Sequence, residues 1–187
     1  MSELETIVTQ DTQRWLKRAV VGLNLCPFAK SVMTKQRIRY RVCASPQPQD
    51  LLHVLREELL YLSQSDPDVL DTTLLMAPNA LPDFLDFNDF LADCDDVLQA
   101  LSLDGVLQIA DFHPNYQFGG TTPDDVSNCT NRSPYPTLHL LRESSIDRAV
   151  QAYPDAADIF ERNIEVLQNL GMQGWLALGV QASRPKD

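Results

Sequence analysis

The sequence lacks long apolar runs, and this absence narrows the class of protein. No stretch approaches the roughly 20 apolar residues that a membrane-spanning helix needs. The N-terminal segment has early acids and no uninterrupted apolar core, so it does not have the pattern of a secretory signal. We therefore expect a cytoplasmic protein with no membrane partner.

Cysteines are few and far apart. Cys26, Cys43, Cys94 and Cys129 show neither the Cys-x-x-Cys spacing of zinc and redox sites nor the density of a small secreted scaffold. The four side chains are therefore expected to be reduced thiols.

Basic residues are also in the minority. There are 15 Lys and Arg against 26 Asp and Glu, which gives a formal net charge of −11. Nucleic acids and anionic membranes require a basic surface, and single-stranded nucleic acid also requires aromatic platforms. Aromatic residues make up only 7% of the chain and the basic residues are dispersed, so no nucleic-acid partner is expected.

The remaining composition is that of an ordinary globular protein. The 187 residues are 44% hydrophobic and 22% charged, which suits one hydrophobic core. No repeat, low-complexity segment or linker divides the chain. We expect a single soluble domain over residues 1–187.

Hydrophobic periodicity predicts alternating helices and strands. The predicted helices span residues 3–25, 48–62, 82–101 and 155–171, the last with Asp155 as its N-cap and Gly171 as its end. The predicted strands span 37–44, 71–77, 105–110 and 136–142, and residues 175–180 form either a short strand or a packed tail. Arginines alternate with apolar residues in the first strand, which indicates a half-buried or edge strand, whereas the apolar third strand is expected at the centre.

This order of elements predicts an α/β layered domain with a mostly parallel four-stranded sheet covered by helices, because strand-helix-strand crossovers make neighbouring strands parallel. The order after the first helix also resembles a thioredoxin-like topology, without its Cys-x-x-Cys motif. The direction of the fourth strand stays open.

A long polar loop at residues 112–136 is expected to carry function. It has no helix or strand periodicity, and ordered loops of this length inside a compact domain are usually functional. It begins at the carboxyl end of the third strand, where ligands bind in open α/β sheets.

Several motifs resemble one family. They are GLNLCPFAK at 22–30, DFLDFNDFL at 83–91, LQIADFHPNYQFGG at 107–120 and TNRSPYPTLHLLRE at 130–143. Together they are similar to the family DUF1415, a domain of unknown function found in bacteria and plants. The resemblance runs over nearly the whole chain and implies a single-domain protein, but it brings no established activity.

Two histidines lie in or near the loop. His113, between Asp111 and Tyr116, can be oriented as a general acid or base, and the alternative is a histidine hydrogen-bonded to loop backbone. His139 lies inside the fourth strand, where a buried structural histidine is favoured over a ligand-binding one.

The loop also contains donors suited to an anion. Arg132 lies between Asn131 and Ser133, and Thr121 precedes it, so guanidinium, amide and hydroxyl groups are available to a carboxylate or phosphate. The alternative is an arginine that holds the loop together by bonding its carbonyl groups.

Cys26 is a possible nucleophile. If Pro27 begins a new helix, Cys26 lies at its N-terminus with Lys30 one turn later, an arrangement that favours a thiolate. A buried structural thiol is the alternative. Cys26, Asp111, His113 and His139 also have the chemistry of metal ligands, but no diagnostic spacing, so metal and cofactor stay undetermined.

Two functions follow as hypotheses. The first is a cytoplasmic enzyme acting on a small anionic metabolite, with His113, Cys26 and Asp111 as catalytic residues. Its substrate would be held by Arg132, Asn131, Ser133, Tyr116, Thr121, Lys30 and His139. The second is a non-catalytic ligand-binding or protein-interaction domain that uses the same loop. The oligomeric state stays open.

Overall fold

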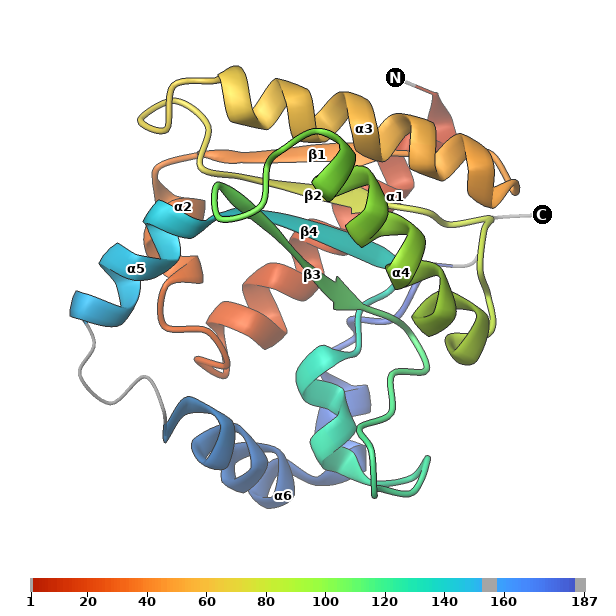
Figure 1. Ribbon diagram of the computed structural model, residues 1–187. Helices are drawn as coiled ribbons and strands as arrows, with labels where there is room; N and C mark the ends of the chain where they lie inside the picture. Colours follow the sequence, from red (N-terminus) through yellow and green to blue (C-terminus); the bar gives the residue numbers. More distant parts are fainter. Residues whose placement is uncertain (1, 153–157, 184–187) are drawn as a thin grey trace.

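The chain forms an α/β domain in the computed structural model, which describes residues 2–152 and 158–183 (Figure 1). The strands are β1 (Ile38–Val42), β2 (Thr72–Met76), β3 (Leu107–Phe112) and β4 (Thr137–Arg142). The α-helices are α1 (Glu3–Trp15), α2 (Ala29–Thr34), α3 (Pro48–Gln64), α4 (Phe84–Ala100), α5 (Glu143–Ala152) and α6 (Ile159–Ala177). A π-helical segment, η1 (Leu16–Val21), continues α1, and a 3-10 helix, η2 (Val126–Asn131), lies in the long loop.

The four strands form one mixed sheet in the order β1-β2-β4-β3. Only β1 and β2 pair in parallel, whereas β4 is antiparallel to both β2 and β3. The prediction of a mostly parallel sheet is therefore wrong. The helical crossovers do make β1, β2 and β3 run the same way, but β4 follows a loop instead of a crossover helix and returns in the opposite direction between two of them. The thioredoxin-like topology stays a prediction.

The position of β3 also differs from the expectation. The insertion of β4 beside β2 moves β3 to an edge of the sheet, although its apolar sequence suggested a central strand. The edge position of β1 agrees with the prediction made from its alternating arginines. Glu58 of α3 is buried and accepts two hydrogen bonds from Arg39 of β1, which fixes that helix over the strand.

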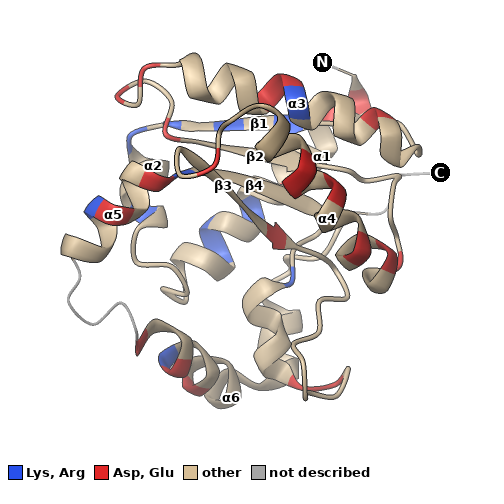
Figure 2. Cartoon of the chain, in the orientation of Figure 1, with Lys and Arg blue, Asp and Glu red and all other residues tan. Residues whose placement is uncertain are grey.

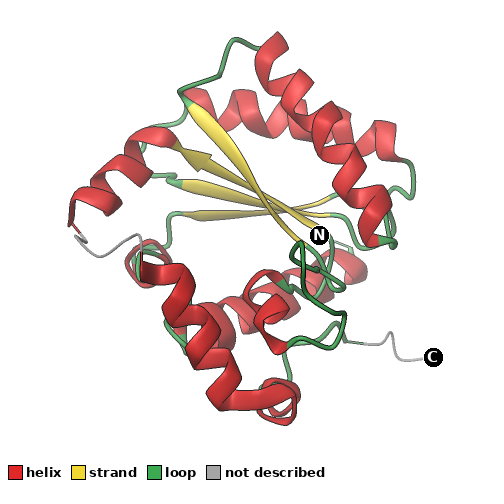
Figure 3. Cartoon of the chain, turned by 60° about the horizontal axis from the view of Figure 1, so that its bottom comes forward, coloured by secondary structure: helices red, strands yellow, loops and turns green. Residues whose placement is uncertain are grey.

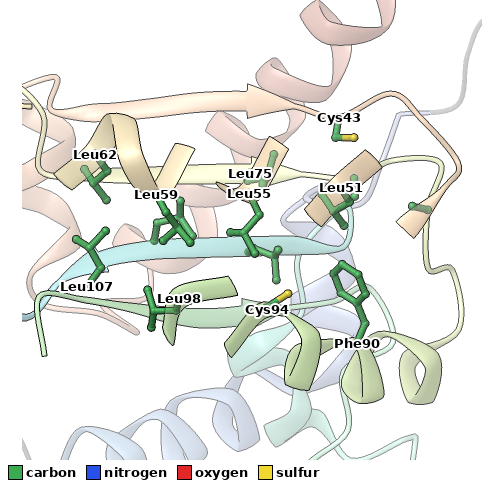
Figure 4. Packing of buried hydrophobic residues seen from close by; sticks show 14 of the residues in the cluster. Cys43, Leu51, Leu55, Leu59, Leu62, Leu75, Phe90, Cys94, Leu98 and Leu107 are labelled. Atoms are coloured by element: carbon green, nitrogen blue, oxygen red, sulfur yellow. The ribbon is translucent and has the colours of Figure 1, made fainter. Parts of the chain in front are cut away.

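Helices cover both faces of the sheet (Figure 3). Helices α3 and α4 cover one face, where their leucines and phenylalanines pack on Leu75, Leu107, Leu138 and Leu140 of the sheet (Figure 4). On the other face, α1, η1 and α6 enclose a second cluster that includes Trp15, Leu167 and Trp175. None of the helices in the described part of the chain is long and apolar enough to cross a membrane.

Local sequence signals explain where several helices begin. Ser2 and Glu5 form a reciprocal capping box at α1, Pro48 is in the first turn of α3, and Asp83 accepts backbone N–H groups at the start of α4. These three predicted helices are confirmed. The first ends its helical run at Val21 instead of residue 25, where the chain turns into the segment before α2.

The C-terminal part holds two further differences. Helix α5 directly follows β4 and was not predicted. Gly171, with φ of 68°, breaks α6, but the helix resumes and reaches Ala177, so residues 175–180 form no strand. The predicted N-cap Asp155 lies outside the described residues.

Candidate functional site

The loop between β3 and β4 is held by its own buried side chains. The amide oxygen of Asn128 accepts the backbone N–H of Phe118 at 2.9 Å and the hydroxyl of Thr121 at 2.8 Å. The amide nitrogen of Asn128 donates to the carbonyl of Thr122, and Asp125 caps η2. Asn128 is fully buried, so this residue, which the sequence analysis did not single out, organises the loop.

His113 is fully buried at the base of the loop. Its Nδ1 accepts the backbone N–H of Asn115 at 3.1 Å, so the proton is on Nε2, which donates to the carbonyl of Leu81 at 3.1 Å. Burial lowers the pKa of His113, which keeps the ring neutral. Both ring nitrogens therefore have backbone partners, and this geometry favours the structural alternative over an acid or base role.

Arg132 also bonds loop carbonyls. Its Nε donates to Tyr116 at 3.2 Å and its Nη2 to Pro123 at 2.7 Å. These bonds support the alternative role predicted for Arg132, in which it holds the loop together. They also fix the plane of the guanidinium, which lines a cavity described below.

The other predicted donors bond neighbouring groups of the loop and of β3. The Asn131 side chain donates to the Asp111 carbonyl at 3.4 Å, and the Ser133 hydroxyl donates to the Tyr135 carbonyl at 2.6 Å. Thr121 bonds Asn128 and the Phe118 carbonyl.

Tyr116 and Asp111 lie close to this network. The Tyr116 ring packs on Phe84 of α4, with ring centroids 4.9 Å apart. Burial, with a smaller effect of the Asp111 charge, raises the pKa of Tyr116, and burial raises that of Asp111. Asp111 and His113 are near in sequence, but the ring nitrogens of His113 form their hydrogen bonds with backbone groups.

His139 lies on the other face of the sheet. Its ring contacts Phe112, which also packs on Trp15, whereas the ring of His113 contacts Phe84 and Phe87 of α4. Burial lowers the pKa of His139 to about 4. The two histidines therefore do not share a site.

Cys26 and Lys30 lie in the segment around α2. The N-cap of α2 is Phe28, so Cys26 does not cap a helix, and its half-buried side chain packs against the cluster of Trp15, Leu167 and Trp175. Lys30 is exposed. Within residues 2–152 and 158–183, no group of three or more His, Cys, Asp or Glu side chains could hold a metal ion.

A cavity of about 430 Å³ lies between the loop and the start of α4. Asn115, Gln117, Pro123 and Arg132 form its loop side, and Asp83, Phe84 and Leu85 form its helix side. The side-chain N–H of Gln117 donates to the carbonyl of Thr121, and Leu85 is 70% exposed. The cavity thus joins a polar wall, which includes a fixed guanidinium, to an apolar wall.

Arg132 is the one predicted site residue among those that line this cavity. Asn115 and Gln117 lie within the predicted loop, but nothing in their local sequence distinguished them from their neighbours. Phe84 and Leu85 come from α4, which was predicted as a helix but not as part of the site. Their contribution depends on how α4 lies against the loop.

The fold and cavity define an α/β domain with a mixed four-stranded sheet and one long ordered loop beside a partly apolar pocket. The family model "Protein of unknown function (DUF1415)" matches residues 7–177, and the chain belongs to this family. No curated protein and no solved structure matches the chain.

Proposed function

We propose that this protein is a non-catalytic ligand-binding domain that holds a small anionic molecule in the cavity beside Arg132. The observation that carries this proposal is the cavity itself, where an arginine fixed by two carbonyl groups faces the same space as two amide side chains and an aromatic ring. Binding sites commonly combine an apolar wall with a few oriented polar groups. A carboxylate or phosphate on the ligand would pair with the guanidinium.

The neighbouring carboxylate does not oppose this assignment. Asp83 Oδ1 accepts the backbone N–H groups of Leu85 and Asp86, so its charge is directed toward the helix terminus. The positive end of the α4 dipole partly offsets that charge. Arg132 is then the group that selects the sign of the ligand.

Binding is favoured over catalysis because the predicted catalytic groups are not assembled around this space. Both nitrogens of His113 are bonded to backbone, and Cys26 packs in the cluster on the other face of the sheet. The enzyme hypothesis stays a prediction. The cytoplasm is retained as the proposed compartment, since all four thiols are unpaired.

The test is a thermal-shift and calorimetric screen of small carboxylates and phosphates against the wild-type protein and two variants. Asn115→Asp introduces a negative charge at the cavity with almost no change in shape. Gln99→Glu introduces the same charge at the exposed far end of α4. A ligand that stabilises the wild type and Gln99→Glu but binds Asn115→Asp about tenfold more weakly supports the proposal. Equal binding by all three proteins would place the ligand elsewhere.

A further inference from the structure

We infer that the open edge of β1 is a docking site for an extended acidic protein segment, which would add to the sheet as a fifth strand. This surface is separate from the cavity beside Arg132. The inference rests on the backbone of β1, the two faces of the strand and the distribution of charge around it.

The backbone of β1 has one unpaired side. The Arg37 carbonyl accepts a hydrogen bond from Asp71, and the Cys43 N–H donates to Met76, so the odd-numbered residues direct their backbone groups toward β2. The even-numbered residues Ile38, Tyr40 and Val42 therefore direct theirs away from the sheet. Within the described residues these outward groups have no hydrogen-bond partner, which makes the edge a template for another strand.

The face of β1 that is turned toward α1 borders a groove of about 480 Å³. Ile38 and Tyr40 of the strand and Met33 of α2 provide its apolar side chains, and Gln13 and Lys17 lie across from them on α1 and η1. An added strand would place every second side chain into this groove. Apolar residues fit that position.

The face of β1 that is turned toward α3 carries arginines in place of apolar side chains. Arg39 and Arg41 pair with Glu58 of α3, and their side chains are 36% and 39% exposed. Strand alternation places Arg37 on the same side. The carboxylate of Glu58 lies between the guanidinium groups of Arg39 and Arg41, Arg41 is also 3.9 Å from Glu57, and Arg37 pairs with the exposed Asp68 at 3.2 Å. An added strand would place its other side chains beside this row, where acidic residues are complementary.

Positively charged residues are concentrated in the part of the sequence that forms this surface. Eight of the 15 Lys and Arg lie between Arg14 and Arg41, and no Asp or Glu lies between Thr12 and Gln49. Figure 2 shows basic residues on β1 and on the helix beneath it, and acidic residues along α4. Among the described residues, Lys17 and Lys35 make no ion pair within 4.0 Å. In a chain of net charge −11, this segment is the part suited to an acidic partner.

The same arginines disfavour a second copy of this chain as the partner. Pairing of two β1 edges would bring the arginine rows of both copies side by side on one face of the joined sheet. Like charges on adjacent strands are destabilising. The fitting partner is a different segment, in which acidic and apolar residues alternate.

The test uses a fluorescent peptide of about ten residues in which Glu and Val alternate, and fluorescence anisotropy with the full-length protein. Two control peptides accompany it. One has the same composition with the Glu and Val residues in separate blocks, and the other is the alternating peptide with N-methyl groups on every second amide. Strand addition predicts that both controls bind at least about tenfold more weakly, since each loses the side-chain pattern or the backbone donors.

Two variants at one position test the backbone directly. Tyr40→Pro removes an outward N–H that β2 does not use, and Tyr40→Ala removes the same side chain but keeps that N–H. We expect Tyr40→Pro to bind the alternating peptide about tenfold more weakly than Tyr40→Ala. If Tyr40→Pro does not fold, the N-methylated peptide provides the same comparison on the wild-type protein.

Charge is tested with Lys17→Glu, and Arg148→Glu on α5 is the matched control. Weaker peptide binding by Lys17→Glu alone agrees with the inference. Three results would overturn it: equal binding of the alternating and block peptides, tighter binding of single-stranded DNA of similar charge, or a dimer in sedimentation analysis that Tyr40→Pro converts to a monomer.

Discussion

The Nε2 atom of His113 lies 3.1 Å from the carbonyl oxygen of Leu81 and joins the end of β3 to the turn before α4. Leu81 has φ of 53°, a conformation that is unfavourable for a branched side chain. The hydrogen bond holds this turn in place beside the cavity. The histidine thus stabilises the geometry of the site without facing it.

Replacement of His113 should therefore affect stability before anything else. We expect His113→Ala to lower the free energy of unfolding by about 3 kcal/mol, because it removes a fully buried ring and two hydrogen bonds. Urea unfolding followed by circular dichroism measures this change. A variant as stable as the wild type would contradict the structural role and return His113 to the catalytic hypothesis.

His113, which is buried, and His139, which is half-buried, predict a pH dependence of stability. Burial lowers the pKa of His113 and lowers that of His139 to about 4, so the unfolded chain takes up protons first as the pH falls below about 6.5. Stability should therefore decline from that pH down to about 4.

His139→Leu should reduce this decline without abolishing it, since His113 contributes with the same sign. The measurement is the urea midpoint at a series of pH values, with His53→Leu as the control because His53 lies on the exposed side of α3. Identical slopes for wild type and His139→Leu would show that His139 does not stay neutral in the fold.

Asp11 predicts a second loss of stability, at a lower pH than the one due to the histidines. It is buried and accepts hydrogen bonds from Arg14, Ser183 and Tyr135, joining α1 to the C-terminal segment and to the end of the long loop. Burial acts to raise its pKa, but these hydrogen bonds outweigh burial and leave the pKa below its ordinary value of 3.8. Its stabilising contribution is therefore complete above that value and is lost as the pH falls through the lowered pKa.

We expect Asp11→Asn to lose about 2 kcal/mol at neutral pH, because an amide cannot accept all of these donors. The variant should also lose less stability than the wild type below pH 3.8. Asp89→Asn, at an exposed position of α4, is the control. If the two variants had the same stability at neutral pH, Asp11 would not hold the three segments together.

The four cysteines should differ in their reaction with iodoacetamide under native conditions. Cys43, Cys94 and Cys129 are buried, and burial raises the pKa of Cys129 and raises that of Cys94 to about 12. Cys26 is half-buried, so it should be modified first. Peptide mapping by mass spectrometry measures the order, and prior modification of Cys129 would show that the long loop opens in solution.

The helices were predictable because their signals are local. The apolar spacing along α3 and α4 and the caps Ser2 and Asp83 require no knowledge of the remaining chain. The strand segments were likewise found from local patterns, such as the alternation in β1 and the apolar run in β3. The sheet order was not, because β4 could return on either side of β3, and that choice depends on contacts between distant residues.

The candidate cavity lies beside the loop that the sequence singled out, but its lining could not be predicted in detail. The loop and Arg132 stand out in the sequence, whereas the role of His113 depends on which atoms face its two nitrogens. A histidine bonded to Leu81 and Asn115 has the same sequence signature as a catalytic one. The expectation that the basic residues are dispersed is wrong for one part of the chain, since eight of the 15 Lys and Arg lie between Arg14 and Arg41. The overall charge of −11 obscured this segment.

Native mass spectrometry of gently purified protein tests the central claim most directly, when the wild type is compared with Asn115→Asp and with the same samples after denaturation. The account predicts that the wild type retains a small anionic molecule, that Asn115→Asp does not, and that the molecule released on denaturation is chemically unchanged after incubation. Retention of the same molecule by both proteins would contradict the cavity as the binding site, and its conversion to a product would contradict a non-catalytic function.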